Sequence, residues 1–158
     1  MKYMFDTNIF NDIVKKSIDI NTFQENITYY ATNVQWSELN ATTDIQLREK
    51  LKAMFSRLET FKLPTESFCF DRSQLDIDKL GDGVLYTKIK KFIDELNKKK
   101  AKKKEGNGNT PDALIAETSI QNNITLVTHD KELFKAITEF EGSAVNLYYI
   151  LNDSSRNK

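Results

Sequence analysis

The sequence has little cysteine, glycine or proline: one Cys, 5 Gly and 2 Pro among 158 residues. The single thiol, Cys69, excludes a disulfide framework within the chain and is typical of a reducing compartment. No apolar run approaches the roughly 20 residues that a membrane-spanning helix needs, and Asp6 interrupts the apolar start as it would not in a signal peptide. We therefore expect a cytoplasmic protein without a membrane segment.

The chain also lacks an excess of charge of either sign, because 23 basic residues balance 23 acidic ones. A global field that attracts nucleic acid is excluded, so any such attraction has to come from a local patch. The length is that of one domain with a core of its own. We expect a single domain over residues 1–151 and a polar C-terminal tail over 152–158.

The most informative stretch runs from Asn109 to Phe134. Thr110 is a candidate helix cap, the proline after it suits the first helical position, and Asp112 then falls in the first turn. Ile124–Val127 is a short apolar run of the kind found in strands buried on both faces. Asp130 follows that strand. Because ligands of open α/β sheets bind at the carboxyl ends of the strands, Asp112 and Asp130 form a candidate pair at one edge.

Two further acids follow strand-like segments in the first third of the chain. Asp6 ends the apolar run Tyr3–Phe5, and Asn8 after it is a candidate cap for an amphipathic helix. Glu38 lies one turn into a helix that follows the strand-like segment Ile27–Thr32. The pattern therefore predicts four carboxylates at the same edge of a sheet.

The rest of the chain favours an α/β fold. Apolar residues recur at helical spacing over Leu47–Leu58 and from Val84 to about Asn97. Lys131–Phe140 is predicted as a helix and Ala144–Ile150 as the last strand. Strands alternate with helices at both ends of the chain, which indicates a parallel sheet with helices on its faces.

The ordered acids resemble those of a PIN domain. The sequence shows DTN near its start, a Glu in the second strand–helix unit, then D-x-L-I-A and T-x-D, over the span from Asp6 to Asp130. The resemblance implies a three-layer α/β/α domain around a mainly parallel sheet, and metal-dependent cleavage of RNA. Small PIN proteins are commonly the VapC-like toxins of VapBC-type toxin–antitoxin pairs, which implies an antitoxin partner and often a homodimer.

The resemblance also implies roles for individual residues. Crowded carboxylates repel unless a cation neutralises them, and hard divalent cations such as Mg²⁺ or Mn²⁺ prefer oxygen ligands. Asp6 and Asp112 are then expected to bind the ion directly, and Glu38 and Asp130 partly through water. The hydroxyl and amide side chains beside them are expected to orient the carboxylates or to contact phosphate; they are Thr7, Asn8 and Thr128.

A lysine run follows the second long helix. Its members are Lys98, Lys99, Lys100, Lys102, Lys103 and Lys104. The run is either a solvated helix end or an arm that contacts RNA phosphates, whose neutralisation makes binding salt-dependent. The sequence favours neither interpretation over the other.

Other functions stay open. A PIN nuclease of RNA maturation or decay would need no antitoxin, and a non-catalytic RNA-binding module would need no metal. A haloacid-dehalogenase-type phosphatase also starts with an Asp at a strand end, but it requires an acid where this chain has Asn8. We expect Trp36 in the core, Glu117 as a solvated side chain, and His129, the single histidine, as an exposed one.

Overall fold

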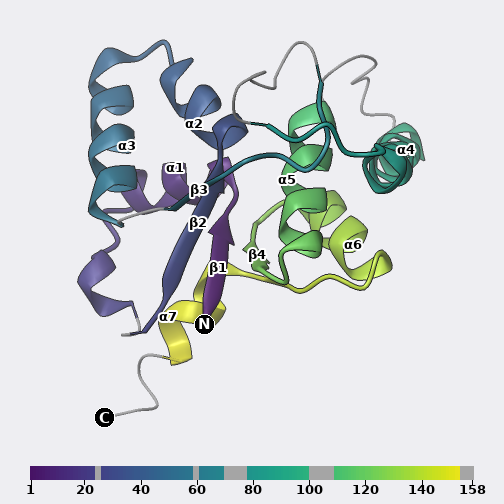
Figure 1. Ribbon diagram of the computed structural model, residues 1–158. Coiled ribbons are helices and arrows are strands. Elements are labelled where there is room, and N and C mark those ends of the chain that lie inside the picture. Colours follow the sequence, from purple (N-terminus) through teal and green to yellow (C-terminus); the bar gives the residue numbers. More distant parts are fainter. Residues whose placement is uncertain (24–25, 59–60, 70–77, 100–108, 154–158) are drawn as a thin grey trace.

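The computed structural model describes residues 1–23, 26–58, 61–69, 78–99 and 109–153. These residues form one sheet whose five strands are all parallel, in the order β3-β2-β1-β4-β5 (Figure 1). The predicted α/β class with a parallel sheet is confirmed. The strands are Lys2–Phe5 (β1), Thr28–Thr32 (β2), Phe61–Leu63 (β3), Thr125–Val127 (β4) and Ala144–Val145 (β5).

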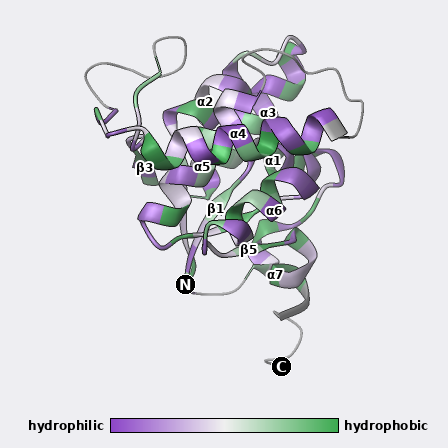
Figure 2. Ribbon diagram, turned by 90° about the vertical axis from the view of Figure 1, so that its right-hand side faces the viewer, coloured by the Kyte–Doolittle hydropathy of each residue, from purple (hydrophilic) through white to green (hydrophobic). Residues whose placement is uncertain are grey.

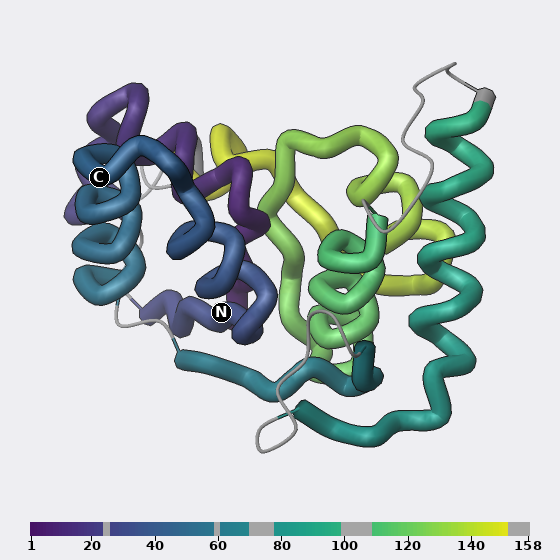
Figure 3. The backbone as a smooth tube through the Cα atoms, turned by 90° about the horizontal axis from the view of Figure 1, so that it is seen from above, coloured from purple at the N-terminus to yellow at the C-terminus, as the bar shows by residue number. Residues whose placement is uncertain are grey.

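Helices cover both faces of the sheet, which confirms the predicted three layers. Figure 3 shows α3 and α4 on opposite flanks of the molecule. One face carries α1 (Thr7–Lys15), η1 (Ile20–Thr22), α3 (Ile45–Arg57) and α7 (Leu147–Asp153). The other face carries α4 (Val84–Lys99), α5 (Thr110–Gln121) and α6 (Lys131–Glu139), and α2 (Asn33–Asn40) reaches both.

Alternation along the central strands creates the two cores. Successive side chains of a strand point to opposite faces, so Phe5 packs in the core under α1 and α3, while Met4 packs in the core under α5 and α6. Val127 and Leu126 divide in the same way. Both strands are therefore buried on both faces, which explains their nearly continuous apolar sequence.

Helix α4 is amphipathic. Within α4, Ile89 and Ile93 are buried one turn apart, whereas Lys88 and Lys91 are exposed, and Figure 2 shows hydrophobic and hydrophilic segments mixed along this helix. In the part of the chain that the structure describes, no helix has both the length and the apolar character that crossing a membrane requires.

Polar residues at the strand ends start the helices of the carboxyl edge. Asp6 caps α1, because its side chain accepts from the Thr7 backbone N–H, and Asp130 caps α6. Thr32 and Gln35 form a capping box at α2. The predicted cap Asn8 was wrong by two residues, since Asn8 lies inside α1 and α1 already begins at Thr7.

The C-terminal segment differs from its predicted strand. Strand β5 ends at Val145, and α7 begins at Leu147 and runs to Asp153. The side chain of Asn146 accepts from the Tyr148 backbone N–H at 3.1 Å, a local bond that starts a helix instead of a strand. Leu147 and Ile150, three residues apart, are buried on one face of α7. Residues 154–158 of the predicted tail lie outside the described residues.

The prediction of a solvated Glu117 was also wrong. Glu117 is 1% exposed and accepts from the Ser67 hydroxyl at 2.8 Å. Ser67 belongs to a segment after β3 that lies over α5. The sequence of α5 alone does not show that another segment buries this side of the helix. Burial raises the pKa of Glu117, against the hydrogen bond from Ser67. Trp36 was predicted correctly, since it packs against the core beside Phe55.

Candidate active site

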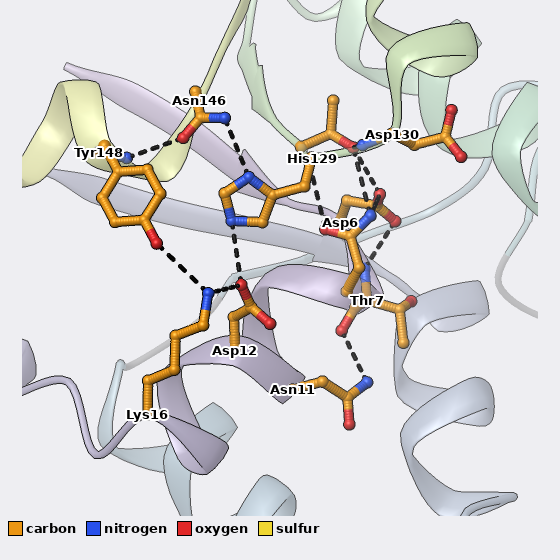
Figure 4. Close-up of polar contacts among 11 residues, drawn as sticks. Asp6, Thr7, Asn11, Asp12, Lys16, His129, Asp130, Asn146 and Tyr148 are labelled. Carbon is orange, nitrogen blue, oxygen red and sulfur yellow. Dashed lines mark hydrogen bonds and ion pairs between the residues drawn. The ribbon is translucent and has the colours of Figure 1, made fainter.

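Asp6 lies at the centre of the candidate site, at the end of β1 and the start of α1. Its side chain is buried, and both of its oxygens accept hydrogen bonds. The Thr7 backbone N–H donates to Oδ1 at 2.7 Å, and the Thr128 hydroxyl donates to Oδ2 at 2.7 Å. The Asn8 amide also donates to Oδ2. These bonds fix the carboxylate at the carboxyl edge of the central strands (Figure 4).

Asp6 is electrostatically unusual. Burial raises the pKa of Asp6 from 3.8 to about 6, even though the hydrogen bonds from Thr128 and Thr7 lower it. The negative charges of Glu38 and Asp130 raise the pKa further. The charged groups that act on Asp6 in this way are both acids, so the site concentrates negative charge on a side chain that has little water around it.

Glu38 reaches the site from α2. The Thr7 hydroxyl donates to Oε2 of Glu38 at 2.5 Å, while the backbone of the same threonine bonds Asp6. Thr7 therefore bridges two acids that are far apart in the sequence. The capping box at the start of α2 holds the helix against β1, because the Gln35 amide donates to the Phe5 carbonyl at 3.1 Å.

Asp130 lies at the site through the turn between β4 and α6. Its backbone N–H donates to the Thr128 hydroxyl at 3.0 Å, and its Oδ1 accepts from the backbone N–H groups of Glu132 and Leu133. Figure 4 shows the Asp130 carboxylate turned away from Asp6. Its negative charge nevertheless raises the pKa of Asp6, and its role in metal binding stays a prediction.

Asp112 lies in the first turn of α5, and Figure 1 shows that α5 begins at the carboxyl edge of the sheet. The predicted cap, Thr110, is the first helical residue, and Asn109 precedes it as the cap. Asn109 makes no capping bond; its amide donates to Asp94 on α4 at 2.6 Å. Thus α4 anchors the end of α5 that carries Asp112, a role that the periodicity of α4 does not reveal.

Comparison with solved structures identifies the fold. The chain is similar to VapBC2 from Rickettsia felis bound to a DNA fragment from its promoter, with a TM-score of 0.54, 24% identity, and 92% of this chain and 98% of that chain covered. VapBC-1 from nontypeable Haemophilus influenzae matches with a TM-score of 0.50, 17% identity and the same two coverages. The chain has the PIN-domain fold of VapC-like toxins.

The sequence alone finds fewer relatives than the structure does. No protein-family model matches the sequence, and no curated protein matches it. The resemblance to PIN domains therefore rested on the order of a few polar residues, and the structure confirms the fold that this resemblance implied.

The resemblance to PIN domains implies a divalent metal ion among the acids at this edge of the sheet. Among the described residues, no three His, Cys, Asp or Glu side chains gather closely enough to form a ready-made cage. Mg²⁺ does not need one, because it typically binds through one or two carboxylates and keeps several waters. The side chains around Asp6 offer oxygen donors and excess negative charge. The donor set therefore fits a hydrated divalent cation.

His129 is the feature of the candidate site that the sequence interpretation missed. It was predicted to be exposed, yet its side chain is 23% exposed and lies between Asp12 and Asn146 (Figure 4). Asp12 lies one helical turn after Asn8 on α1, so both face the same way. This spacing was the available signal, but Asn146 belongs to a segment that was predicted as a strand.

The lysine run is described only at its start. Lys98 and Lys99 end α4, and the side chain of Lys98 is exposed. Lys100, Lys102, Lys103 and Lys104 lie outside the described residues. The choice between a solvated helix end and an RNA-binding arm stays a prediction.

The raised pKa of Asp6 predicts a pH-dependent stability. A carboxyl whose pKa is higher in the folded state favours folding when protonated, so its contribution is complete below 3.8 and is lost as the pH rises through about 6. The difference between 3.8 and about 6 corresponds to roughly 3 kcal/mol of unfolding free energy. Asp6→Asn should remove this loss, since Asn also caps helices.

Urea unfolding in the presence of a chelator measures this difference. The unfolding free energy of Asp6→Asn minus that of wild type should rise from about pH 4 to about pH 8. The difference between the two proteins isolates Asp6 from the other carboxyls. A difference that stays constant over this range would show that Asp6 has an ordinary pKa in the folded protein.

Proposed function

We propose that this chain is a metal-dependent endoribonuclease that hydrolyses RNA phosphodiester bonds in the cytoplasm, as the toxin of a VapBC-like toxin–antitoxin pair. The observation that carries the proposal is the buried Asp6, whose pKa is raised to about 6 within an acidic site at the carboxyl edge of a PIN fold. Such a site favours the binding of a cation. A bound cation offsets both the cost of burying the Asp6 charge and the repulsion between Asp6 and the neighbouring acids.

The proposed metal-binding residues are those of the predicted set. Asp6 and Asp112 bind Mg²⁺ or Mn²⁺ directly, and Glu38 and Asp130 complete the site partly through water. When bound, such an ion lowers the pKa of a water and stabilises charge on phosphate oxygens. The chain's own side chains orient these acids: Thr128 and Asn8 donate to Asp6, and Thr7 donates to Glu38.

The proposed partners are RNA and a small antitoxin. Support for the antitoxin comes from the relatives, since the similar structure from Rickettsia felis is VapBC2 on DNA from its own promoter. A homodimer is proposed on the same resemblance. The lysine run that begins at Lys98 is the proposed phosphate contact, and it predicts a salt-dependent affinity for RNA.

The contacts of Asn8 favour the nuclease over a phosphatase of the haloacid-dehalogenase type. Such a phosphatase needs a carboxylic acid at this position. Asn8 instead donates from Nδ2 to Asp6, and its Oδ1 accepts from the backbone N–H of His129 at 3.4 Å. A carboxylate cannot make the first of these bonds, because it has no donor.

Incubation of the purified chain with RNA tests the proposal. We expect internal cleavage in Mg²⁺ or Mn²⁺ and intact RNA in a chelator, with activity restored when the metal is returned. Product ends should arise within the RNA and not only at its termini. Tight binding without cleavage in either metal would contradict the nuclease and favour the non-catalytic RNA-binding module.

A further inference from the structure

Five side chains form a closed ring beside the site (Figure 4). The Asn146 amide lies 3.0 Å from Nδ1 of His129, and Nε2 of His129 lies 3.2 Å from Oδ2 of Asp12. Lys16 binds the same Asp12 oxygen at 2.7 Å and the Tyr148 hydroxyl at 3.3 Å. The Tyr148 backbone N–H closes the ring by donating to Oδ1 of Asn146 at 3.1 Å. The ring joins α1, the β4–α6 turn and α7.

The ring defines the tautomer of His129. Oδ1 of Asn146 is engaged by the backbone of Tyr148, so Nδ2 faces the imidazole and donates to its Nδ1. In a neutral ring Nδ1 then accepts and Nε2 carries the proton. Nε2 lies 3.2 Å from the Asp12 carboxylate but makes no hydrogen bond with the described residues. The imidazole therefore lies between an amide that donates to Nδ1 and a carboxylate that is close to Nε2.

The backbone on either side of the imidazole belongs to the candidate site. The residue before it, Thr128, donates to Asp6, and the residue after it is Asp130. The backbone N–H of His129 itself donates to Asn8, which in turn donates to Asp6. Any shift of the imidazole would move this turn relative to Asp6.

We propose that His129 is a positioning residue of the nuclease: held between Asp12 and Asn146, it fixes the turn that holds Thr128 against Asp6 and carries Asp130 beside the site. The proposal rests on the proposed function. His129 does not touch the reacting atoms. It acts as the groups behind metal ligands do, whose loss typically reduces metal affinity or activity by roughly 10- to 100-fold.

Two conservative variants separate the two contacts of His129, one to Asn146 and one to Asp12. His129→Asn keeps an acceptor near the place of Nδ1, within reach of Asn146, and loses Asp12. His129→Gln keeps a donor near the place of Nε2, within reach of Asp12, and loses Asn146. His129→Ala loses both contacts. The three variants differ in side-chain volume as well as in the contacts they keep. If the losses follow the contacts that are removed and not the side-chain volume, His129 positions the turn and does not merely fill space.

Three measurements read out the position of the turn. The Mn²⁺ affinity, measured by calorimetry without RNA, should fall roughly 10- to 100-fold in His129→Ala, and less in the Asn and Gln variants. The kcat of RNA cleavage should fall with it while KM for RNA stays near that of wild type. Hydrogen exchange should quicken at the backbone N–H groups of Asp130, Glu132 and Leu133, which bond within this turn.

Lys16→Met is the matched control. It removes two contacts of the same ring of side chains, to Asp12 and Tyr148, and leaves both contacts of His129 in place. Its Mn²⁺ affinity and kcat should match those of wild type, and an equal loss in this variant would overturn the positioning role. Wild-type values in all three His129 variants would overturn it too. If wild type neither binds Mn²⁺ nor cleaves RNA, the proposed function fails and this proposal falls with it.

Discussion

Asp6→Asn should lose RNA cleavage by roughly 10³-fold while the domain stays folded. A bound metal contributes several kcal/mol of charge stabilisation, and each 1.4 kcal/mol or so corresponds to about tenfold in rate. Asn keeps the side-chain size and the ability to accept from the Thr7 backbone N–H, so α1 keeps its cap. The Thr128 hydroxyl can rotate to accept from the new amide, whereas the Asn8 amide loses its acceptor at this position. What disappears is the negative charge that a hard cation requires.

The matched control for this substitution is Asp44→Asn. Asp44 caps α3 by accepting from the Leu47 backbone N–H at 3.0 Å, and it is exposed. The chemical change and the capping role are the same as at Asp6, but the charge is lost from another helix. Asp44→Asn should cleave RNA as wild type does. Full cleavage by Asp6→Asn would contradict the metal assignment.

Metal binding gives a second measurement on the same pair of variants. A ligand that binds only the native state stabilises it by mass action. Mg²⁺ or Mn²⁺ should therefore raise the melting temperature of wild type and of Asp44→Asn, and leave that of Asp6→Asn unchanged. In a chelator, Asp6→Asn should be the more stable protein above about pH 6, because it avoids burying a charge.

Local sequence rules predicted the parts of this site that depend on neighbouring residues. An acid soon after an apolar run, as at Asp6 and Asp130, marks the end of a strand and the start of a helix. The apolar run and the helix cap lie within the same few residues, so both can be predicted locally. Since parallel strands share one carboxyl edge, their order in the sequence suffices to place these acids together. The helix carrying Glu38 follows the same rule.

The parts that the sequence did not predict depend on contacts that hydrophobic periodicity does not show. Ala144–Ile150 is apolar enough for a strand, yet the local bond from the Tyr148 backbone N–H to Asn146 starts α7 after β5. Without α7, no sequence rule brings Asn146 to His129. Likewise, Glu117 is polar by type, and its burial follows from the segment carrying Ser67. For Glu117 a tertiary contact overrode the local preference, and for α7 a local side-chain bond outweighed the apolar pattern.

The toxin proposal predicts the largest effect in cells. Expression of the chain alone in its host should arrest growth, and Asp112→Asn should be harmless. Asp112 lies in the first turn of α5, where its charge favours the helix dipole by about 0.3–1 kcal/mol. Asn preserves the side-chain size and removes the charge. The Asp44→Asn control should arrest growth as wild type does.

An antitoxin should reverse this arrest by covering the acidic site. A basic side chain such as Arg pairs bidentately with carboxylates, so it can occupy the place of the cation. We expect a small neighbouring gene to restore growth when co-expressed, and its product to co-purify with wild type and with Asp112→Asn. If wild type is harmless, the maturation or decay nuclease becomes the better proposal. If Asp112→Asn arrests growth as strongly as wild type, the arrest does not come from metal-dependent cleavage at this site.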